Sequence, residues 1–228
     1  MQAQDATTLF FLKLWPWAEA NKNRLIAGAV ALVIAIAVIW FAACQSESKE
    51  IAAGQALTQV TLSGAGLQAD AYLKVAGQHP GTAAGRRALL QGAAALFDEG
   101  KFADAQTQFQ KFLDAHSASE FSGQAALGVA ASLDAQGKAD LAVAAYQRVI
   151  SGYSDNVITG DAKFNVARIE ESQDKLTDAA ALYQEVANTV PGTSIGSEAA
   201  MRLMELKGKL PVPAPATAPA APLLKSGQ

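Results

Sequence analysis

The chain has 228 residues, half of them hydrophobic and 17% charged, with a formal net charge of −3 and a pI near 5.4. This charge balance, with no large basic cluster, argues against nucleic acid as a partner. A single cysteine cannot form an intramolecular disulfide. Once the terminal segments described below are set aside, the length that remains suits one folded domain of ordinary size.

An uninterrupted apolar run at residues 25–44 predicts a transmembrane helix. As a helix it would be about 30 Å long, the thickness of the hydrocarbon core of one bilayer. Lys13, Lys22 and Arg24 precede the run, whereas Lys49 is the first basic residue after it. By the positive-inside rule, residues 1–24 form a cytoplasmic tail. We expect a single-pass protein of the inner (cytoplasmic) membrane, with everything after residue 44 in the periplasm.

The same run has two other interpretations. A cleavable secretory signal also combines a basic region with an apolar core, although its core is usually shorter. In addition, Phe41-Ala42-Ala43-Cys44 resembles the lipobox of a bacterial lipoprotein, in which Cys44 would be lipidated after cleavage. A retained anchor and a lipidated Cys44 both tether the same domain on the same side of the membrane, so that placement does not depend on the choice between them.

Aromatic residues return at a spacing of 37 residues, at Tyr72, Phe109, Tyr146 and Tyr183. The tripeptide Pro80-Gly81-Thr82 also reappears three periods later, at residues 191–193. Such a period indicates internal structural repeats. Inside one repeat, apolar residues follow helical spacing over 88–97 and again over 102–113, with Gly100 between them. Each unit is therefore a predicted helical hairpin, and the hairpins must stack to bury their apolar faces.

These residues resemble the tetratricopeptide repeat, whose signature has a small residue in the first helix, a turn glycine, and an alanine then an aromatic in the second helix. The small residue is Ala93, Ala130 and Ala167; the turn position is Gly100, Gly137 and Asp174; the second-helix alanine is Ala105, Ala142 and Ala179. Two positions depart from the family: Gly92 stands where leucine is usual near the middle of the first helix, and Asp174 replaces the turn glycine. The 37-residue period also exceeds the usual 34 residues. We expect the extra residues to lengthen the links between hairpins, at 117–121 and 154–158.

The resemblance implies an all-α, tetratricopeptide-like solenoid at 45–208, with repeats at 84–119, 121–156 and 158–193. A degenerate hairpin at 47–79 would precede them, and a Pro/Ala-rich tail at 209–228 would follow. We expect a capping helix at 195–207 to cover the last hairpin with Ala199, Met201 and Met204.

In this family the first helices of the repeats line a concave surface that binds proteins or peptides. The corresponding partner-binding residues would be Arg87, Gln91, Phe97, Gln124, Asp134, Asp161, Asn165, Arg168 and Glu171. Phe97 fits the core better than it fits a contact with a partner.

Catalysis is not expected. There is neither a phosphate-binding loop of the Walker type nor a helical His-Glu-x-x-His pair. His79 and His116 lie at predicted helix ends, where histidine suits the helix dipole without any metal. We therefore predict no enzyme activity, cofactor, metal or small-molecule substrate.

The order of anchor and exported repeats is similar to that of the ancillary subunit family of the bacterial Sec translocon, SecYEG, which is linked to periplasmic chaperones. Proteins of outer-membrane assembly and of division-coupled envelope maintenance share the longer repeat. Both functions remain open at this stage, and both are scaffolding functions.

Overall fold

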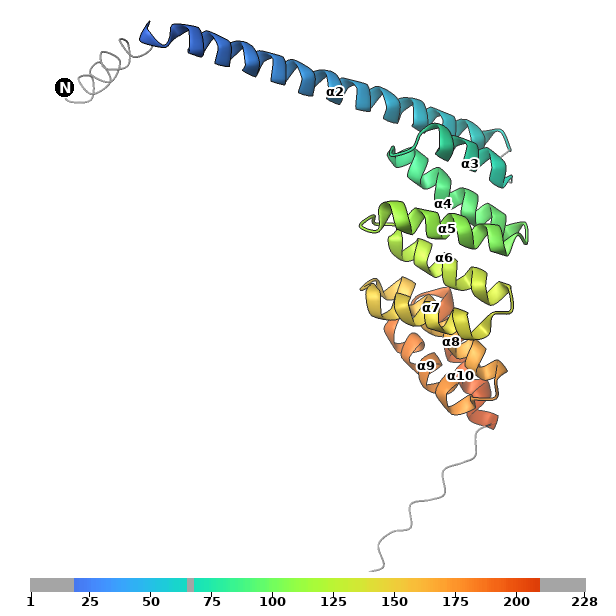
Figure 1. The fold of residues 1–228 in the computed structure, drawn as a ribbon. Coiled ribbons are helices and arrows are strands. Elements are labelled where there is room, and N and C mark those ends of the chain that lie inside the picture. Colours follow the sequence, from blue (N-terminus) through green and yellow to red (C-terminus); the bar gives the residue numbers. More distant parts are fainter. Residues whose placement is uncertain (1–18, 65–67, 210–228) are drawn as a thin grey trace, which may run out of the picture.

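The computed structural model describes residues 19–64 and 68–209, and within these ranges the chain forms helices and no strands (Figure 1). The helices are α2 (Lys22–Leu62), α3 (Ala69–Gln78), α4 (Ala83–Asp98), α5 (Phe102–His116), α6 (Ser122–Ala135), α7 (Ala139–Gly152), α8 (Asn156–Ser172), α9 (Leu176–Thr189) and α10 (Ser194–Lys209). The predicted cytoplasmic tail up to residue 18 and the Pro/Ala-rich tail from residue 210 lie outside the described residues.

Successive helices run antiparallel and stack into a solenoid (Figure 1). The pairs α4–α5, α6–α7 and α8–α9 are the three predicted repeats, and the C-terminal part of α2 pairs with α3 as the degenerate first hairpin. First helices of neighbouring hairpins also contact one another, from α2 through α4, α6 and α8 to α10. The predicted all-α tetratricopeptide-like solenoid is confirmed.

The repeated small and aromatic residues form the core. All six repeat alanines have no exposed surface: Ala93, Ala105, Ala130, Ala142, Ala167 and Ala179. The aromatic column is also buried, with Tyr146 and Tyr183 the largest fully buried side chains. Small residues let the two helices of a hairpin approach closely, and the aromatic residue fills the space between neighbouring hairpins. The sequence period therefore corresponds to a packing period.

The turns inside the three hairpins share one backbone conformation. Gly100, Gly137 and Asp174 all have positive φ, at 77°, 75° and 62°. Glycine adopts this left-handed region without strain, and aspartate is among the few other residues that tolerate it. Asp174 thus replaces the usual glycine without changing the turn.

The Pro-Gly-Thr tripeptide proves to be a helix N-cap. Thr82 accepts a hydrogen bond from the Gly85 backbone N–H at 2.9 Å, and Thr193 accepts one from Gly196 at 3.1 Å. A side chain at Gly85 would meet the His79 carbonyl oxygen, and one at Gly196 would meet that of Val190. The motif is therefore Pro-Gly-Thr-x-x-Gly, and its final glycine is needed for close packing of the backbone.

The predicted lengthening of the links is right at one place and wrong at another. Residues 117–121 do form a link, between α5 and α6. The second link, however, spans only residues 153–155, and Asn156, Val157 and Ile158 form the first turn of α8. The Asp155 carboxylate caps that helix by accepting from the backbone N–H groups of Val157 and Ile158. The cap moves the helix start three residues toward the N-terminus.

Gly92 stands where the family usually has leucine, and the structure explains the exchange. A Cβ atom at Gly92 would lie 2.7 Å from the side chain of Leu73 on α3. The Leu73 side chain therefore fills the space that a leucine side chain at position 92 would otherwise occupy.

The capping helix exists as α10, but its buried face differs from the prediction. Ala199 is buried as expected, together with Leu203 and Leu206, whereas Met201 and Met204 are 62% and 75% exposed. By the 37-residue period, Met201 and Met204 correspond to Phe164 and Ala167 on α8. Those two residues face α9. In the described chain no second helix follows α10, so this face has no covering neighbour there.

Helix α2 is continuous over 41 residues. Its last turns belong to the solenoid: Ala53 is fully buried, and Leu57 and Val60 pack against the core of the first repeat. Its N-terminal part extends beyond the other helices (Figure 1) and exposes large apolar residues such as Ile34, Val38 and Trp40. By length and composition this helix could cross a membrane.

Candidate partner-binding surface

The nine predicted binding residues lie on the three first helices α4, α6 and α8. Exposure varies among them. Arg87, Gln91, Gln124 and Arg168 are exposed, whereas Phe97, Asp134, Asp161, Asn165 and Glu171 are half-buried. Their availability to a partner therefore depends on the contacts that each already makes inside the solenoid.

Asp134 and Arg168 form an ion pair that joins α6 to α8. The residues come from adjacent repeats and bring two of the predicted positions into contact. The Asp134 side chain is the more enclosed partner, at 17% exposure against 49% for Arg168. The guanidinium therefore still presents donors at the surface, and it could bind an acceptor group of a partner without losing the aspartate.

Glu171 makes a hydrogen bond to a core residue rather than an ion pair. Its carboxylate accepts a hydrogen bond from the Tyr183 hydroxyl at 3.0 Å, within the α8–α9 hairpin. Burial, followed by this bond to a carboxylate, raises the pKa of Tyr183, so the tyrosine stays neutral and continues to donate. Glu171 thus orients a core tyrosine, and only part of its carboxylate remains available to a partner.

Asp161 and Asn165 lie one turn apart on α8. The Asn165 amide donates to the Asp161 backbone carbonyl at 2.9 Å, which leaves the Asp161 carboxylate out of that bond. Burial raises the pKa of Asp161, and the nearby Asp155 charge raises it further. A cationic group from a partner would stabilise the ionised form of this carboxylate.

Two of the predicted residues in the first repeat contact aromatic rings instead. The Arg87 guanidinium lies 5.8 Å from the ring centre of Phe121, just before α6. Phe97 packs edge-to-face on Phe102 with ring centres 5.1 Å apart and joins the core cluster. Gln91 and Gln124 are exposed and uncharged. The surface consequently changes from apolar and amide-bearing at α4 to charged at α8.

The structure has a second feature that was not predicted from the sequence. It lies on the side of the hairpins opposite the predicted binding residues. Recesses lie between successive second helices, one between α3 and α5 over α4, and one between α5 and α7 over α6. They are related by the 37-residue period: Leu73, Lys111 and His116 in the first recess become Gln110, Arg148 and Tyr153 in the second. None of the nine predicted residues lines either recess. The repeat period, applied to exposed rather than apolar positions, could have predicted them.

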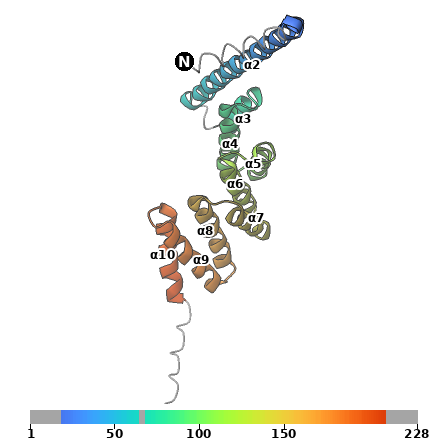
Figure 2. The same cartoon turned by 90° about the vertical axis from the view of Figure 1, so that its left-hand side faces the viewer.

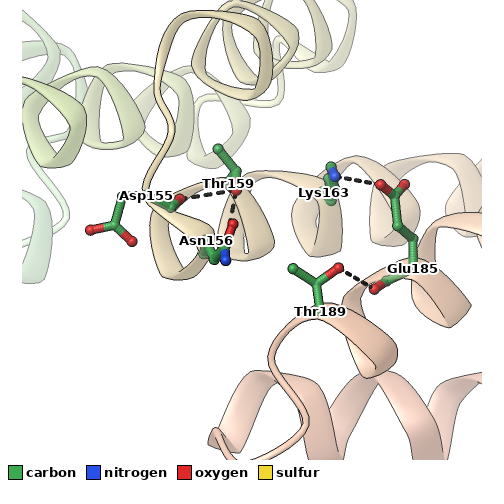
Figure 3. Close-up of polar contacts among 6 residues, drawn as sticks. All are labelled: Asp155, Asn156, Thr159, Lys163, Glu185 and Thr189. Carbon is green, nitrogen blue, oxygen red and sulfur yellow. Dashed lines mark hydrogen bonds and ion pairs between the residues drawn. The ribbon is translucent and has the colours of Figure 1, made fainter.

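One repeat further along the chain, the residues equivalent to those of the two recesses include an ion pair. Lys163 on α8 and Glu185 on α9 are 2.5 Å apart (Figure 3). By the repeat period, Glu185 takes the place of Lys111 and Arg148, so the sign of the charge reverses along this side of the solenoid. The Thr189 hydroxyl donates to the Glu185 carbonyl nearby, also drawn in Figure 3. The three equivalent interfaces therefore differ in charge.

The described residues bear on the predictions about metal ligands and the two histidines. No group of three or more His, Cys, Asp or Glu side chains is arranged to hold a metal ion there. His79 and His116 lie at the ends of α3 and α5, as predicted. The arrangement that these surfaces can support is the binding of other chains.

Comparison with known proteins supports the reading of the repeats. Residues 90–157 and 132–192 match the tetratricopeptide repeat family. The matched segments run from the middle of α4 to the end of α9 and include the repeated alanines and turn residues of the three hairpins. The fold is a tetratricopeptide-like solenoid. Tetratricopeptide repeats commonly form scaffolds for protein–protein interaction, and the match implies a function of that kind for residues 90–192.

Several solved structures resemble this chain. The type III secretion translocator chaperone SycD of Yersinia enterocolitica aligns with TM-score 0.46 and 19% identity, over 54% of this chain and 92% of that one. The MamA protein aligns with TM-score 0.49 and 17% identity, over 72% and 92%. BtubC (BKLC) from P. vanneervenii gives TM-score 0.47 and 16% identity, over 72% and 66%. No curated protein sequence matches the chain.

Proposed function

We propose that this protein is a membrane-anchored tetratricopeptide-repeat scaffold that binds protein partners in the periplasm, at the protein-export translocon and together with envelope chaperones. The observation that carries the proposal is the continuity of α2, which runs from an exposed apolar segment directly into the core of the first repeat. A repeat domain attached without a flexible linker stays close to the membrane. It is thus suited to receive partners at the mouth of a membrane channel.

The apolar part of α2 has the properties of an anchor. None of the described residues in the most apolar part of α2 is buried in the structure. A soluble protein would have to expose this surface to water at a cost of about 25 cal/mol for each Å². Insertion into a bilayer removes that cost, and the basic residues before the span favour a cytoplasmic N-terminus.

Intact mass and labelling would test the anchor and its orientation. A retained anchor predicts that the membrane-extracted chain keeps the residues before Cys44 and carries no lipid. The lipoprotein alternative predicts a chain that begins at a lipidated Cys44. For orientation, Ser117→Cys in a Cys44→Ala background should react with a membrane-impermeant maleimide in cells whose outer membrane has been permeabilised. Labelling only after the inner membrane is broken would contradict the periplasmic placement.

Photo-crosslinking in living cells would identify the partners. The reactive residue is best placed at Gln91 and Gln124, which are uncharged and exposed on the first-helix surface. Gln147 on α7 serves as the control because it is exposed on a second helix. We expect translocon subunits or envelope chaperones from positions 91 and 124 only. Adducts of equal yield from position 147 would contradict binding on the first-helix surface.

A second function is a repeat adaptor in outer-membrane assembly or division-coupled envelope maintenance. The same anchor and surface support it, because nothing in the charged and amide-bearing residues is specific to one partner. The crosslinking experiment separates the two functions through the identity of the adducts: assembly or division proteins at positions 91 and 124 would select the adaptor.

A further inference from the structure

The recess between α3 and α5 is cationic although the whole chain is acidic. Its apolar part comes from Leu73, Ala76 and Leu89, and its rim carries Arg86, Lys111 and His116. None of its lining residues is acidic. A shallower depression beside it shares Arg86 and His116 and includes Glu120. In a protein of net charge −3, three cationic or proton-donating groups around one recess favour an anionic ligand.

The position of this recess relative to the proposed anchor follows from one contact. The Glu50 carboxylate on α2 accepts hydrogen bonds from the Ala83 backbone N–H, at 2.8 and 3.0 Å. Ala83 is the first residue of α4 and directly follows the turn at residues 79–82. The edge of the solenoid that carries the turns between hairpins is therefore level with Glu50.

The apolar run ends at Cys44, six residues before Glu50. At about 1.5 Å per residue, the helix separates them by about 9 Å. In Figure 1 the turn between α3 and α4 lies at the end of the solenoid from which α2 extends away. Pro80, Gly81 and His116 line the recess at this same edge. If residues 25–44 span the bilayer, the recess lies about one Debye length from the lipid headgroups.

The charge pattern along the solenoid agrees with this placement. Lys111 in the recess next to the anchor corresponds to Arg148 in the next one and to Glu185 in the third. Glu185 is neutralised by Lys163. At these three equivalent positions, the positive charge that is in no ion pair therefore lies in the two interfaces nearest the end of α2, where an anionic surface would be.

We propose that the recess between α3 and α5 binds the phosphate headgroup of an anionic phospholipid of the membrane in which α2 is anchored. Arg86 and Lys111 supply the positive charges, and the apolar floor of Leu73, Ala76 and Leu89 contacts the nonpolar atoms of the same lipid. The contact fixes the tilt of the solenoid on the membrane and so the direction in which the first-helix surface faces. This proposal rests on the membrane anchor of the proposed function, but not on the identity of the protein partner.

His116 contributes to the same site as a neutral donor. Burial lowers the pKa of His116, and the nearby Arg86 charge lowers it further. The neutral imidazole can still donate one N–H to a phosphate oxygen.

The test uses the full chain in lipid nanodiscs with a photoreactive residue at Ala118, which is exposed beside His116. The control position is Thr177, exposed at the opposite edge of the solenoid near the turn inside the α8–α9 hairpin. We expect lipid adducts at position 118 in discs that contain phosphatidylglycerol and few in discs of phosphatidylcholine alone. Position 177 should give few adducts in either disc.

Charge-removing variants give the quantitative test. Arg86→Gln and Lys111→Gln should each reduce adduct yield at position 118 about fivefold, as expected for loss of one basic residue near an anionic surface. The matched control is Lys138→Gln with Lys175→Gln, which removes two exposed lysines at the opposite edge. It should leave the yield unchanged. Circular dichroism of each variant verifies that the helices are intact.

Three outcomes would overturn the proposal in distinguishable ways. A chain that does not co-elute with nanodiscs contradicts the anchor as well as the lipid site. A chain that co-elutes but gives no excess of lipid adducts at position 118 over position 177 contradicts the lipid site alone. If excess inorganic phosphate abolishes the adducts as fully as removal of phosphatidylglycerol does, the recess binds free phosphate rather than a lipid.

Discussion

At the residue scale, single positions decide where one helix stops and the next can begin. Gly100, Gly137 and Asp174 occupy equivalent turns with positive φ, and Gly85 and Gly196 let a capping backbone approach. These residues contribute little apolar surface. Their importance comes from backbone conformations and distances that a residue with an ordinary side chain would not allow.

Asp174 is the one described non-glycine residue with positive φ. A substitution at this position can therefore increase the stability of the fold. Asp174→Gly should raise the free energy of unfolding by about 0.5–1 kcal/mol, since glycine carries no Cβ penalty in this region. Gly137→Ala should lower it by about 1 kcal/mol for the opposite reason. Thermal melting followed by circular dichroism checks both. Equal melting temperatures of all three chains would contradict the strain argument.

Glu170 provides a pH prediction. Burial, and then the charge of Asp178, raises its pKa from the ordinary value of 4.5, and its Oε2 atom is buried without a hydrogen-bond partner. Because the folded-state pKa is the higher one, protonation favours the folded state. This stability is fully present below the unfolded-state pKa and is lost as pH rises through the raised pKa. Glu170→Gln should therefore melt at a higher temperature than the parent chain at pH 7.

The difference between the two chains should shrink below about pH 4, where both side chains are neutral. Glu198→Gln is the control, because Glu198 is exposed at the surface of α10. A stabilisation by Glu170→Gln that persists unchanged at low pH would mean that burial of the charge is not its cause.

At the element scale, each helix has the face that its neighbours require. In the three complete hairpins the first helix is covered by its own second helix and by the first helices on either side. Helix α10 lacks a second helix in the described chain, so only the face toward α8 and α9 is buried. Methionine occupies the positions on the uncovered face where α8 has Phe164 and Ala167.

Substitutions in α10 should separate these two faces. Leu206→Ala should cost about 2–5 kcal/mol, because Leu206 is fully buried against α9 and leaves a cavity. Met204→Gln should change stability by less than about 0.5 kcal/mol, as expected for an exposed position. Chemical denaturation measures both. A large loss for Met204→Gln would show that another segment covers this face.

At the scale of the whole molecule, stability is a sum over neighbours. Core clusters lie along the solenoid, one around the first repeat, one around α6–α8 and one around α8–α10. Figure 2 shows the helices stacked in sequence order. Among the described residues, the helix contacts lie within the same hairpin or between neighbouring hairpins. A perturbation at one end should consequently weaken its own neighbourhood first.

Removal of α10 tests this locality. A chain ending at Thr193 should exchange the backbone amides of α9 much faster, because Val186 and Val190 lose Leu203 and Leu206 as packing partners. Amides of α5, which pack in the first cluster, should be unaffected. A chain ending at Lys209 is the control, since it keeps α10. Uniformly faster exchange along the whole solenoid would indicate one cooperative unit instead.

The sequence by itself determined the helical hairpins, their number and their core, because the 37-residue period places small, aromatic and turn residues where local geometry and packing both require them. It could not locate the start of α8, which depends on an Asp155 cap, or the buried face of α10, which depends on which neighbours are present. The binding surface was predictable as a set of positions. Only the tertiary structure showed which of those side chains bind each other, as Asp134 and Arg168 do in an ion pair. Such pairs form between separate repeats, so they depend on how the hairpins stack. The recesses between second helices have the same origin, because each is formed by residues about 37 positions apart that meet only when hairpins stack.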